Sequence, residues 1–308
     1  MKTRIFLTGA SGFVGAALAG ELLACGNFEI SALLREPEKS WRLNELLGRL
    51  TCVVGSLDDR LKLENHFASY RPDVVIDLAW QGVAGSERNS SVQWRNIGLH
   101  LELLELGKKY GVKRWIGLGS QAEYGPCERR ISESTETRPT TLYGVSKLAL
   151  CQLTQKICDD NFISCAWVRL FSSYGPRDNT HWLIPYLIQS LIKGDAPDLT
   201  AAEQLWDYIY IDDLVAAISS LVLKADATGI FNVGSGSALP LKYYVETIRN
   251  AIDPSLHIGF GKIPYRSDQV MHLEADVQKL SRATGWKPRA DPYTSILKTV
   301  DWYRKGVS

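Results

Sequence analysis

The sequence lacks a strong net charge and a long apolar run. Its 308 residues include 35 Lys and Arg against 34 Asp and Glu, which leaves a formal charge of +1. Bulk charge therefore gives no support to a nucleic-acid partner or an anionic membrane, although a local basic pocket for a phosphate is compatible with it. The first apolar run, at 5–7, ends at once in Thr8-Gly9-Ala10-Ser11-Gly12. We expect neither a signal peptide nor a membrane helix, and hence a cytoplasmic protein.

Metal-site and disulfide patterns are missing as well. The sequence has six cysteines and five histidines, but no C-x-x-C pair and no H-x-x-x-H pair. We therefore predict no metal site. Cys151 and Cys158 are seven residues apart and would share one face of a helix. They are expected to be small core residues in a reducing compartment.

What the first half of the sequence does have is an alternation of strand-like and helix-like segments. The predicted strands are Arg4–Thr8, Glu29–Leu34, Thr51–Val54, Val74–Ala79, Arg114–Leu118 and Cys165–Leu170. The predicted helices are Phe13–Ala24, Leu43–Leu47, Leu61–Tyr70, Asn89–Tyr110 and Leu142–Asp159. Such alternation indicates β-α-β units with right-handed crossovers. The predicted fold is therefore α/β, with a doubly wound, Rossmann-like parallel sheet.

A glycine-rich segment joins the first predicted strand to the first helix. Its pattern is G-x-x-G-x-x-G, in which Gly9 permits a tight turn, Gly12 lets the backbone approach a pyrophosphate, and Gly15 lets helix and strand pack closely. The free N–H groups and positive dipole end of the helix favour phosphates. A glycine-rich turn without a ligand is the alternative. The predicted dinucleotide contacts here are Gly9, Ser11, Gly12, Phe13, Val14 and Gly15.

The end of the second predicted strand bears on which dinucleotide binds. NAD-preferring sites usually carry an acidic residue there, but this strand ends in Leu34-Arg35. A guanidinium would bind the 2′-phosphate that a carboxylate would repel. We therefore predict that NADP(H) is preferred and that NAD(H) is possible. Because Glu36 follows, Arg35 could instead be an ordinary solvated charge.

The pattern loosens after residue 170, where Gly, Pro, Asp and Asn become frequent. We predict that residues 1–170 and about 206–235 form an NAD(P)-binding domain. Residues of about 171–205 and 236–308 would form a smaller C-terminal substrate-binding lobe.

The segment 143–147 contributes the motif Y-x-x-x-K. On a helix, Tyr143 and Lys147 share a face, and the ammonium would lower the pKa of the phenol from about 10. Such a tyrosine can act as a general acid or base. Ser120 follows a predicted strand at the edge where doubly wound sheets bind ligands, so its hydroxyl could bond the same substrate oxygen. The alternative is an exposed helical pair.

With these motifs, the sequence resembles the extended short-chain dehydrogenase/reductase superfamily, in its NAD(P)-dependent nucleotide-sugar epimerase/dehydratase/reductase branch. The match covers nearly the whole chain and includes Leu78-Ala79, Asn96 and the segments 119–125, 174–176, 206–213, 231–236 and 285–288. It is specific for the superfamily and much less so for the reaction.

The resemblance implies roles for individual residues. Ser120, Tyr143 and Lys147 match the catalytic residues, the last two also binding cofactor, and Asn96 matches a residue that supports the active site. Further implied cofactor contacts are Ser56, Leu57, Leu78 and Ala79. Implied substrate contacts are Gln121, Ser172 and Arg266, the last toward the diphosphate of a sugar nucleotide.

Several positions depart from the family pattern. The dehydratases carry an Asp-Glu pair where this sequence has Gln121-Ala122, so 4,6-dehydration is not expected. An Arg-Asp pair is replaced by Trp206-Asp207, which removes one usual phosphate contact. Phe171-Ser172-Ser173 replaces a Phe-Asn segment that touches the substrate. Gly55-Ser56 replaces a Gly-Asp pair that contacts adenine.

The leading interpretation is an NADPH-dependent reductase of the C4 ketone of a nucleotide-linked 4-keto-6-deoxyhexose, in deoxysugar biosynthesis. The alternative is an NAD-dependent C4 epimerase of a nucleotide sugar, and a third possibility is a non-catalytic dinucleotide sensor. The sequence leaves open the sugar and the base, whether CDP, dTDP, GDP or UDP.

The resemblance also implies a homodimer. In the family, two helices from each subunit form a four-helix interface, and the predicted helices Asn89–Tyr110 and Leu142–Asp159 carry additional apolar residues. The apolar residues concerned are Leu99, Leu103, Leu106, Leu148, Cys151 and Ile157. The alternative is that both helix faces are covered within one chain.

Overall fold

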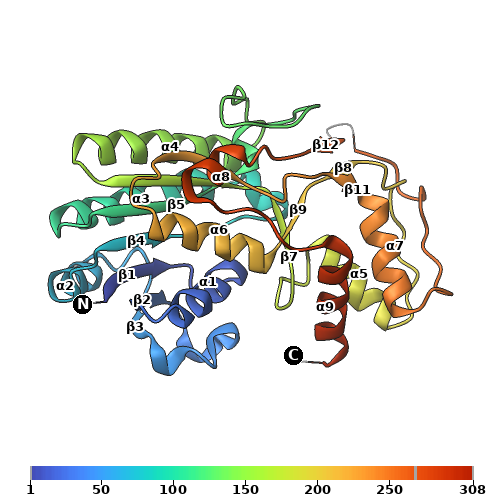
Figure 1. Cartoon of the computed structure of the whole chain (residues 1–308), viewed down its shortest axis with the longest axis horizontal. Coiled ribbons are helices and arrows are strands. Elements are labelled where there is room, and N and C mark those ends of the chain that lie inside the picture. Colours follow the sequence, from blue (N-terminus) through green and yellow to red (C-terminus); the bar gives the residue numbers. More distant parts are fainter. Residues whose placement is uncertain (1, 267–268, 307–308) are drawn as a thin grey trace.

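A seven-stranded parallel sheet forms the centre of the larger part of the molecule (Figure 1). The computed structural model describes residues 2–266 and 269–306. The strands lie in the order β10 (Gly229–Val233), β6 (Ser164–Leu170), β5 (Arg114–Ser120), β4 (Val74–Asp77), β1 (Thr3–Thr8), β2 (Phe28–Leu34) and β3 (Thr51–Val54). All neighbouring pairs are parallel. The predicted doubly wound sheet is confirmed, and its order reverses at β1 and β4, where such sheets bind ligands.

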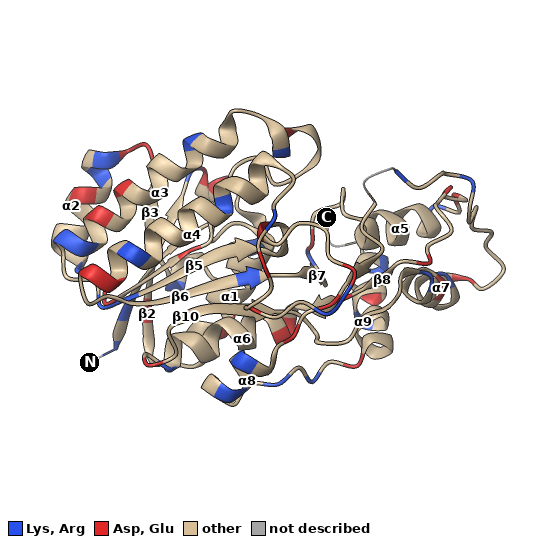
Figure 2. Ribbon diagram, turned by 90° about the horizontal axis from the view of Figure 1, so that it is seen from above, with Lys and Arg blue, Asp and Glu red and all other residues tan. Residues whose placement is uncertain are grey.

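Helices cover both faces of this sheet (Figure 2). One face carries α2 (Arg60–Tyr70), α3 (Val92–Lys109) and α4 (Leu142–Asp160), and the other carries α1 (Phe13–Ala24), α6 (Ile211–Leu223) and α8 (Gln278–Thr284). Successive side chains of a strand point to opposite faces. Accordingly, Phe6 joins the core with Phe67 of α2, whereas Ile5 and Leu7 join the core with Leu18 of α1. Burial on both faces explains why these strands are almost wholly apolar.

A smaller part lies beside the carboxyl ends of the strands (Figure 1). It contains a three-stranded sheet in the order β11 (Leu239–Pro240), β8 (Leu205–Trp206), β12 (His272–Leu273), and a pair formed by β7 (Ser172–Tyr174) and β9 (Tyr208–Tyr210). Its helices are α5 (Leu183–Ile192), α7 (Leu241–Ile252) and α9 (Pro292–Arg304), which pack on one another. The two-lobe division stays a prediction. The predicted division places α8 in the smaller lobe, but this helix packs against β10 and α6 and so belongs with the larger domain.

Two helix predictions differ from the structure. Residues 43–47 do not form an α-helix: the chain makes short 3-10 turns at η1 (Pro37–Lys39), η2 (Trp41–Leu43) and η3 (Leu47–Arg49). A segment this short gains too few hydrogen bonds to offset the cost of helix nucleation. The predicted helix from Asn89 begins only at Val92, because residues 85–89 form a separate 3-10 turn, η4 (Gly85–Asn89).

The two helices of the predicted dimer interface pack against each other within the chain. Leu103, Leu106 and Cys151 are buried in the core of the chain and are not available to a partner, contrary to the prediction, while Leu99, Leu148 and Ile157 are half-buried. Other apolar residues of these helices are exposed, namely Trp94, Leu142, Val145 and Leu153. The burial predicted for Cys151 and Cys158 is confirmed. None of the described helices combines the length and apolarity needed to cross a membrane.

Candidate active site

The turn between β1 and α1 has the geometry of a phosphate-binding loop. Gly9 has a φ of 69°, and a Cβ here would lie 2.8 Å from the amide nitrogen of Ala79. A Cβ on Gly15 would overlap the carbonyl oxygen of Gly9. Helix α1 begins after Gly12 without a side-chain cap, so its first N–H groups remain available to an anion. These features fit the pyrophosphate of a dinucleotide.

A buried hydrogen-bonded link joins this loop to the end of β4. Thr8 Oγ1 donates to Asp77 Oδ1 over 2.7 Å and accepts from the N–H groups of Leu78 and Ala79, each over 3.0 Å. The link holds Leu78 and Ala79 against the glycine loop, where cofactor contacts are predicted. Sequence reasoning did not identify Thr8 and Asp77 as site residues. Their signal is a polar residue at the end of each of two otherwise apolar strands.

The three residues predicted to be catalytic lie together at the carboxyl end of β5. Ser120 ends that strand, and Tyr143 lies in the first turn of α4, which packs against it. Hydrogen bonding with the Ser120 hydroxyl lowers the pKa of the Tyr143 phenol. One turn further along α4, Lys147 Nζ donates to the carbonyl oxygen of Leu118 over 2.6 Å. The arrangement can hold a substrate oxygen and exchange a proton with it.

Burial governs the ionisation of Tyr143 and Lys147. It raises the pKa of Tyr143, while the hydrogen bond from Ser120 and the positive charge of Arg88 lower that pKa. Burial also lowers the pKa of Lys147 to about 8, with the negative charge of Asp77 acting in the opposite direction. Ser120 and Arg88 thus favour the phenolate form of Tyr143, whereas the sequence predicts this role for Lys147.

Comparison with known proteins agrees with the fold and the loop. A profile of the NAD dependent epimerase/dehydratase family matches residues 5–234. The chain belongs to this family. The predicted membership of the extended short-chain dehydrogenase/reductase superfamily is therefore confirmed.

The proteins similar to this chain include enzymes named for nucleotide sugars and a structure that holds one. The chain is 28% identical over 291 residues to the CDP-abequose synthase of Salmonella muenchen, covering 93% of each chain. It is 26% identical over 332 residues to a probable UDP-glucuronate 4-epimerase of Rhizobium meliloti (strain 1021), covering 97% of this chain and 96% of the other. Among solved structures, MoeE5 in complex with UDP-glucose and NAD has a TM-score of 0.85 at 26% identity, covering 99% of this chain and 100% of that one.

In this epimerase/dehydratase-family chain, two amides of α3 hold the loop that follows β4. Asn96 Oδ1 accepts from the N–H of Gln81 over 3.3 Å, and its Nδ2 donates to the Gln81 carbonyl over 3.1 Å. Gln93 Oε1 accepts from Trp80 Nε1 over 2.9 Å, and its Nε2 donates to the carbonyl oxygen of Gly82 over 2.6 Å. A supporting role for Asn96 stays a prediction, and these contacts show how such support would operate.

A buried histidine, His100, lies beside the end of β4. His100 Nδ1 lies 2.6 Å from Asp77 Oδ2, and its ring stacks on that of Trp80 with 5.3 Å between centroids. The ammonium of Lys147 lies 3.8 Å from the centroid of the Trp80 ring. Trp80 therefore contacts both His100 and Lys147. No local motif in the sequence indicates this group of three side chains.

The backbone of Ser120 is fixed by a buried ion pair. Glu123 Oε1 accepts from the N–H of Ser120 over 2.9 Å and from Trp167 Nε1 over 3.0 Å. Its Oε2 accepts from Arg169 Nε over 2.7 Å, and both charged side chains are at most 3% exposed. Glu123 and Arg169 are further residues that sequence reasoning did not assign. Because both carboxylate oxygens of Glu123 accept hydrogen bonds from protein groups, this residue stabilises the structure and is not placed to exchange a proton with a substrate.

The predicted substrate contacts lie on separate elements. Ser172 Oγ accepts from Trp206 Nε1 over 2.8 Å, which ties β7 to β8. Gln121 is half-buried directly after Ser120. Arg266 lies at the end of a described segment, where its carbonyl oxygen accepts from the N–H of Gln269 over 3.1 Å. The roles of Gln121, Ser172 and Arg266 toward a substrate stay predictions.

The predicted adenosine contacts lie at the neighbouring strand ends. Arg35 is exposed immediately after β2, which pairs with β1 and so brings this side chain to the edge that carries the glycine loop. Ser56 follows β3, and its N–H donates to Asp59 Oδ2 over 2.8 Å. The adjacent Leu57 is half-buried. Arg35 can therefore meet a 2′-phosphate or remain in solvent.

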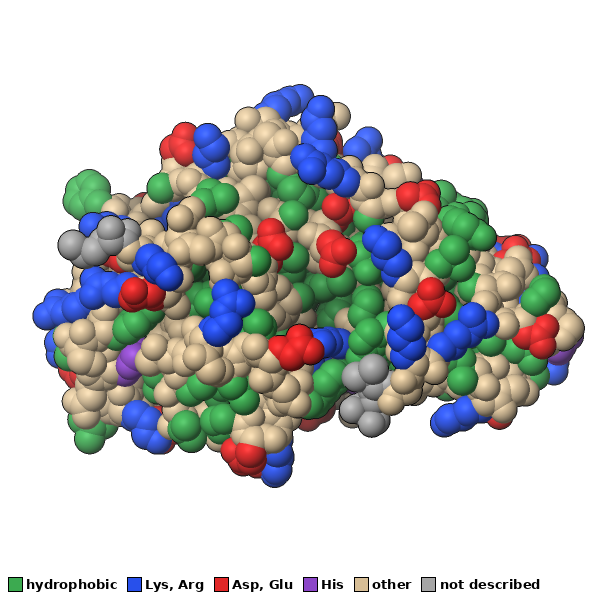
Figure 3. Space-filling view, turned by 60° about the horizontal axis from the view of Figure 1, so that its bottom comes forward, with side chains coloured by type: hydrophobic (Ala, Val, Ile, Leu, Met, Phe, Trp, Pro, Cys, Tyr) green, Lys and Arg blue, Asp and Glu red, His purple; other side chains and the backbone are tan. Residues whose placement is uncertain are grey.

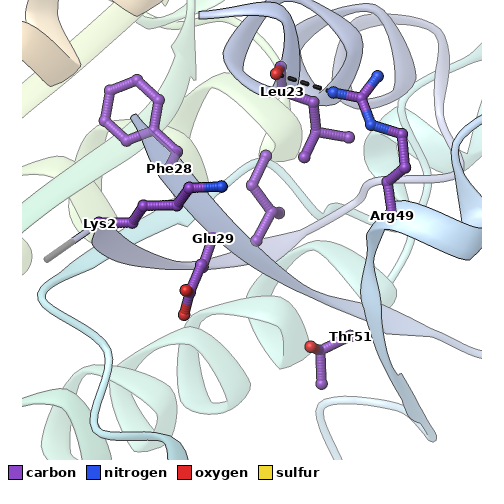
Figure 4. A pocket seen from close by; sticks show the side chains of 7 residues that line it. Lys2, Leu23, Phe28, Glu29, Arg49 and Thr51 are labelled. Atoms are coloured by element: carbon purple, nitrogen blue, oxygen red, sulfur yellow. Dashed lines mark hydrogen bonds between the residues drawn. The ribbon is translucent and has the colours of Figure 1, made fainter. Parts of the chain in front are cut away.

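The surface is hollowed between the two parts of the molecule, and hydrophobic side chains line much of this depression (Figure 3). A separate pocket lies at the opposite edge of the sheet, where Arg49 donates to the carbonyl oxygen of Leu23 over 2.9 Å (Figure 4). It is lined by residues at the amino ends of the strands, including Phe28 and Thr51. That pocket therefore lies away from Ser120, Tyr143 and Lys147.

Proposed function

We propose that the chain is a nucleotide-sugar 4-epimerase that retains its nicotinamide cofactor. The observation that carries this proposal is the placement of Ser120, Tyr143 and Lys147 at one strand end, on the sheet edge that also holds the uncapped start of α1. The glycine loop, Leu78, Ala79 and Lys147 would hold the cofactor, which supplies the hydride acceptor and donor. The similarity to the probable UDP-glucuronate 4-epimerase of Rhizobium meliloti supports the assignment as an epimerase.

The residues of the chain would manage the proton at the C4 oxygen. Tyr143 takes the hydroxyl proton while C4 is oxidised and returns it when C4 is reduced from the other face. The Ser120 hydroxyl donates a hydrogen bond to the same oxygen and so keeps it beside the phenol. Lys147 supports the site electrostatically from within α4. Every proton that leaves the sugar thus returns to it, as an isomerisation requires.

The same geometry argues against 4,6-dehydration. That reaction needs a side chain that removes a proton from C5 and another that protonates the leaving hydroxyl. The residues after Ser120 are an amide, Gln121, and a buried alanine, Ala122, neither of which transfers protons. Glu123 is bound to Arg169, Trp167 and the Ser120 N–H. We therefore place the activity at C4 alone.

Proton NMR of the sugar and the absorbance of reduced nicotinamide together test the proposal. The purified chain would be incubated with UDP-glucose, UDP-glucuronate and the corresponding CDP and dTDP sugars. An epimerase yields the C4 epimer with no net change in absorbance. If no epimer forms from any sugar while 4-keto-6-deoxy sugars oxidise NADPH stoichiometrically, the epimerase proposal is wrong.

A second candidate is the NADPH-dependent 4-ketoreductase of a nucleotide-linked 4-keto-6-deoxyhexose. The observation that favours it is Arg35, exposed at the end of β2 where NAD-preferring sites carry an acid. The similarity to CDP-abequose synthase adds support for a deoxysugar substrate. Here Tyr143 donates its proton to the C4 oxygen as hydride arrives, and the phenol regains a proton from solvent. Assays of 4-keto-6-deoxy sugars on CDP, dTDP, GDP and UDP would identify the base.

Replacing Arg35 by alanine tests the cofactor preference. If the guanidinium binds a 2′-phosphate, Arg35→Ala should weaken NADPH binding by about 10- to 100-fold, since a hydrogen bond to a charged group contributes about 1.5–3 kcal/mol. NADH affinity should hardly change. Fluorescence titration of both cofactors measures this, with Arg282→Ala on α8 as a control for losing an exposed arginine. Equal NADPH affinity of Arg35→Ala and the unmodified chain would remove the assignment.

We also propose a two-fold homodimer through α3 and α4. Leu142, Val145 and Leu153 form an exposed apolar stripe along α4, and Trp94 is exposed on α3. Light scattering at micromolar concentration should give twice the mass of one chain, and Leu153→Glu should shift the mass toward that of the monomer. A monomeric mass for the unmodified chain would exclude the dimer.

A further inference from the structure

A second cation, besides Lys147, lies beside Tyr143. The guanidinium carbon of Arg88 is 4.5 Å from the centroid of the Tyr143 ring. Within the described part of the chain, its hydrogen bond is a long one of 3.4 Å to the carbonyl oxygen of Val83, and no carboxylate forms an ion pair with it. A cation over an aromatic face is attracted by the ring, and far more so when the ring carries a phenolate.

The loop that carries Arg88 is anchored on both sides of this residue. Asn89 Oδ1 accepts from the N–H of Leu142 over 3.0 Å, which ties η4 to the residue directly before Tyr143. On the other side, Gln93 Nε2 donates to the carbonyl oxygen of Glu87 over 2.9 Å. These two hydrogen bonds fix the chain on both sides of Arg88 and so place its side chain beside the Tyr143 ring.

We propose that Arg88 is a second cation, in addition to Lys147, that stabilises the ionised form of Tyr143, acting as a positioning residue for its proton exchange. The proposal rests on the proposed function, in which Tyr143 exchanges a proton with the sugar.

The other charged groups around Tyr143 are engaged elsewhere. From β4 and α3, Asp77 is bound to Thr8 and His100. From η5, Glu123 is bound to Arg169, and its negative charge raises the pKa of Tyr143. From β5, hydrogen bonding with the uncharged Ser120 lowers the pKa of Tyr143.

Lys147, on the same helix as Tyr143, is directed to the Leu118 carbonyl and the Trp80 ring. Burial also lowers its pKa to about 8, so the ammonium is partly neutral in mildly alkaline solution. A guanidinium keeps its charge throughout this range. Arg88 therefore supplies a positive charge that does not disappear as the pH approaches the ionisation of the phenol.

Carbon-13 NMR of the full chain, labelled at the ζ-carbon of tyrosine, tests this inference directly. The chain has 13 tyrosines, and the resonance that is missing in Tyr143→Phe identifies Tyr143. Arg88→Gln should raise the titration midpoint of that resonance by about one pH unit or more. Arg88→Lys, which keeps the charge, should raise it less. The pH dependence of turnover should move in the same direction.

Two further variants make the test specific. Arg95→Gln removes an arginine that also lies over an aromatic ring, 5.5 Å from the centroid of Trp94, and should leave the midpoint unchanged. Asn89→Ala releases η4 from α4 and should raise the midpoint by less than Arg88→Gln, with little added effect when the two are combined. An unchanged midpoint in Arg88→Gln overturns the proposal, whatever the result for Asn89→Ala. The titration needs no substrate, so its outcome is independent of whether the proposed reaction is correct.

Discussion

Tyr143→Phe is expected to lower the turnover number by about 10²- to 10⁴-fold, the usual contribution of a general acid or base. The ring packs edge-on against Trp80, with 6.2 Å between centroids, and phenylalanine keeps this contact. Only the hydroxyl that exchanges the proton and meets Ser120 is lost. Folding and cofactor binding should therefore survive, which circular dichroism and fluorescence titration would check beside the rate.

Tyr293→Phe is a matched control, because Tyr293 is exposed on α9 and has no place in the proposed chemistry. It should retain the full rate. A Tyr143→Phe variant that binds cofactor normally and keeps more than about a tenth of the rate would require another proton donor, since general acid catalysis contributes much more than this. Ser120, relaying a proton from water, would then be the candidate.

Arg169→Met is expected to lower the free energy of unfolding by about 3–5 kcal/mol, the usual effect of removing one partner of a buried ion pair. The substitution leaves the carboxylate of Glu123 buried without its counter-charge, while methionine fills much of the same space. Because Glu123 also accepts from the Ser120 N–H, the turnover number should fall together with stability. Urea denaturation and steady-state kinetics measure the two effects.

A surface pair provides the comparison. Arg138 donates to Glu136 over 2.8 Å, and both side chains are more than two-thirds exposed, so Arg138→Met should have no measurable effect on unfolding. Combining Arg169→Met with Glu123→Gln should restore part of the lost stability, because the unpaired charge is removed. If Arg169→Met unfolds at the same urea concentration as the unmodified chain, the ion pair does not stabilise the fold.

Elements with strong local signals were predicted well from the sequence. Helix Phe13–Ala24 and strand Thr51–Val54 have the predicted bounds. The first follows the glycine loop, and the second is a short segment rich in β-branched residues. The helix predicted at Leu43–Leu47 was wrong, because its apolar spacing also fits short 3-10 turns and the segment is too short to nucleate an α-helix.

The site was predictable where a motif places residues on one element. Tyr143 and Lys147 lie one turn apart on α4, so their spacing alone brings them together. Glu123 and Arg169 are 46 residues apart, and Asp77 and His100 are 23 apart, so these pairs depend on how strands and helices pack. Arg88 reaches Tyr143 from η4, which Asn89 ties to α4. No spacing rule in one sequence predicts such contacts.

The chain enters the smaller part of the molecule three times, and this restricts how related enzymes can exchange it by recombination. The first passage supplies β7, α5, β8 and β9; after α6 and β10 the second supplies β11, α7 and β12; after α8 the third supplies α9. Strand β8 pairs with β11 and β12, and the Asp207 carboxylate accepts from the N–H groups of Ser235 and Gly236. A gene segment carrying one passage alone would leave strand edges and a buried carboxylate without partners. New substrate preferences in such an enzyme therefore arise more readily from single substitutions than from module shuffling.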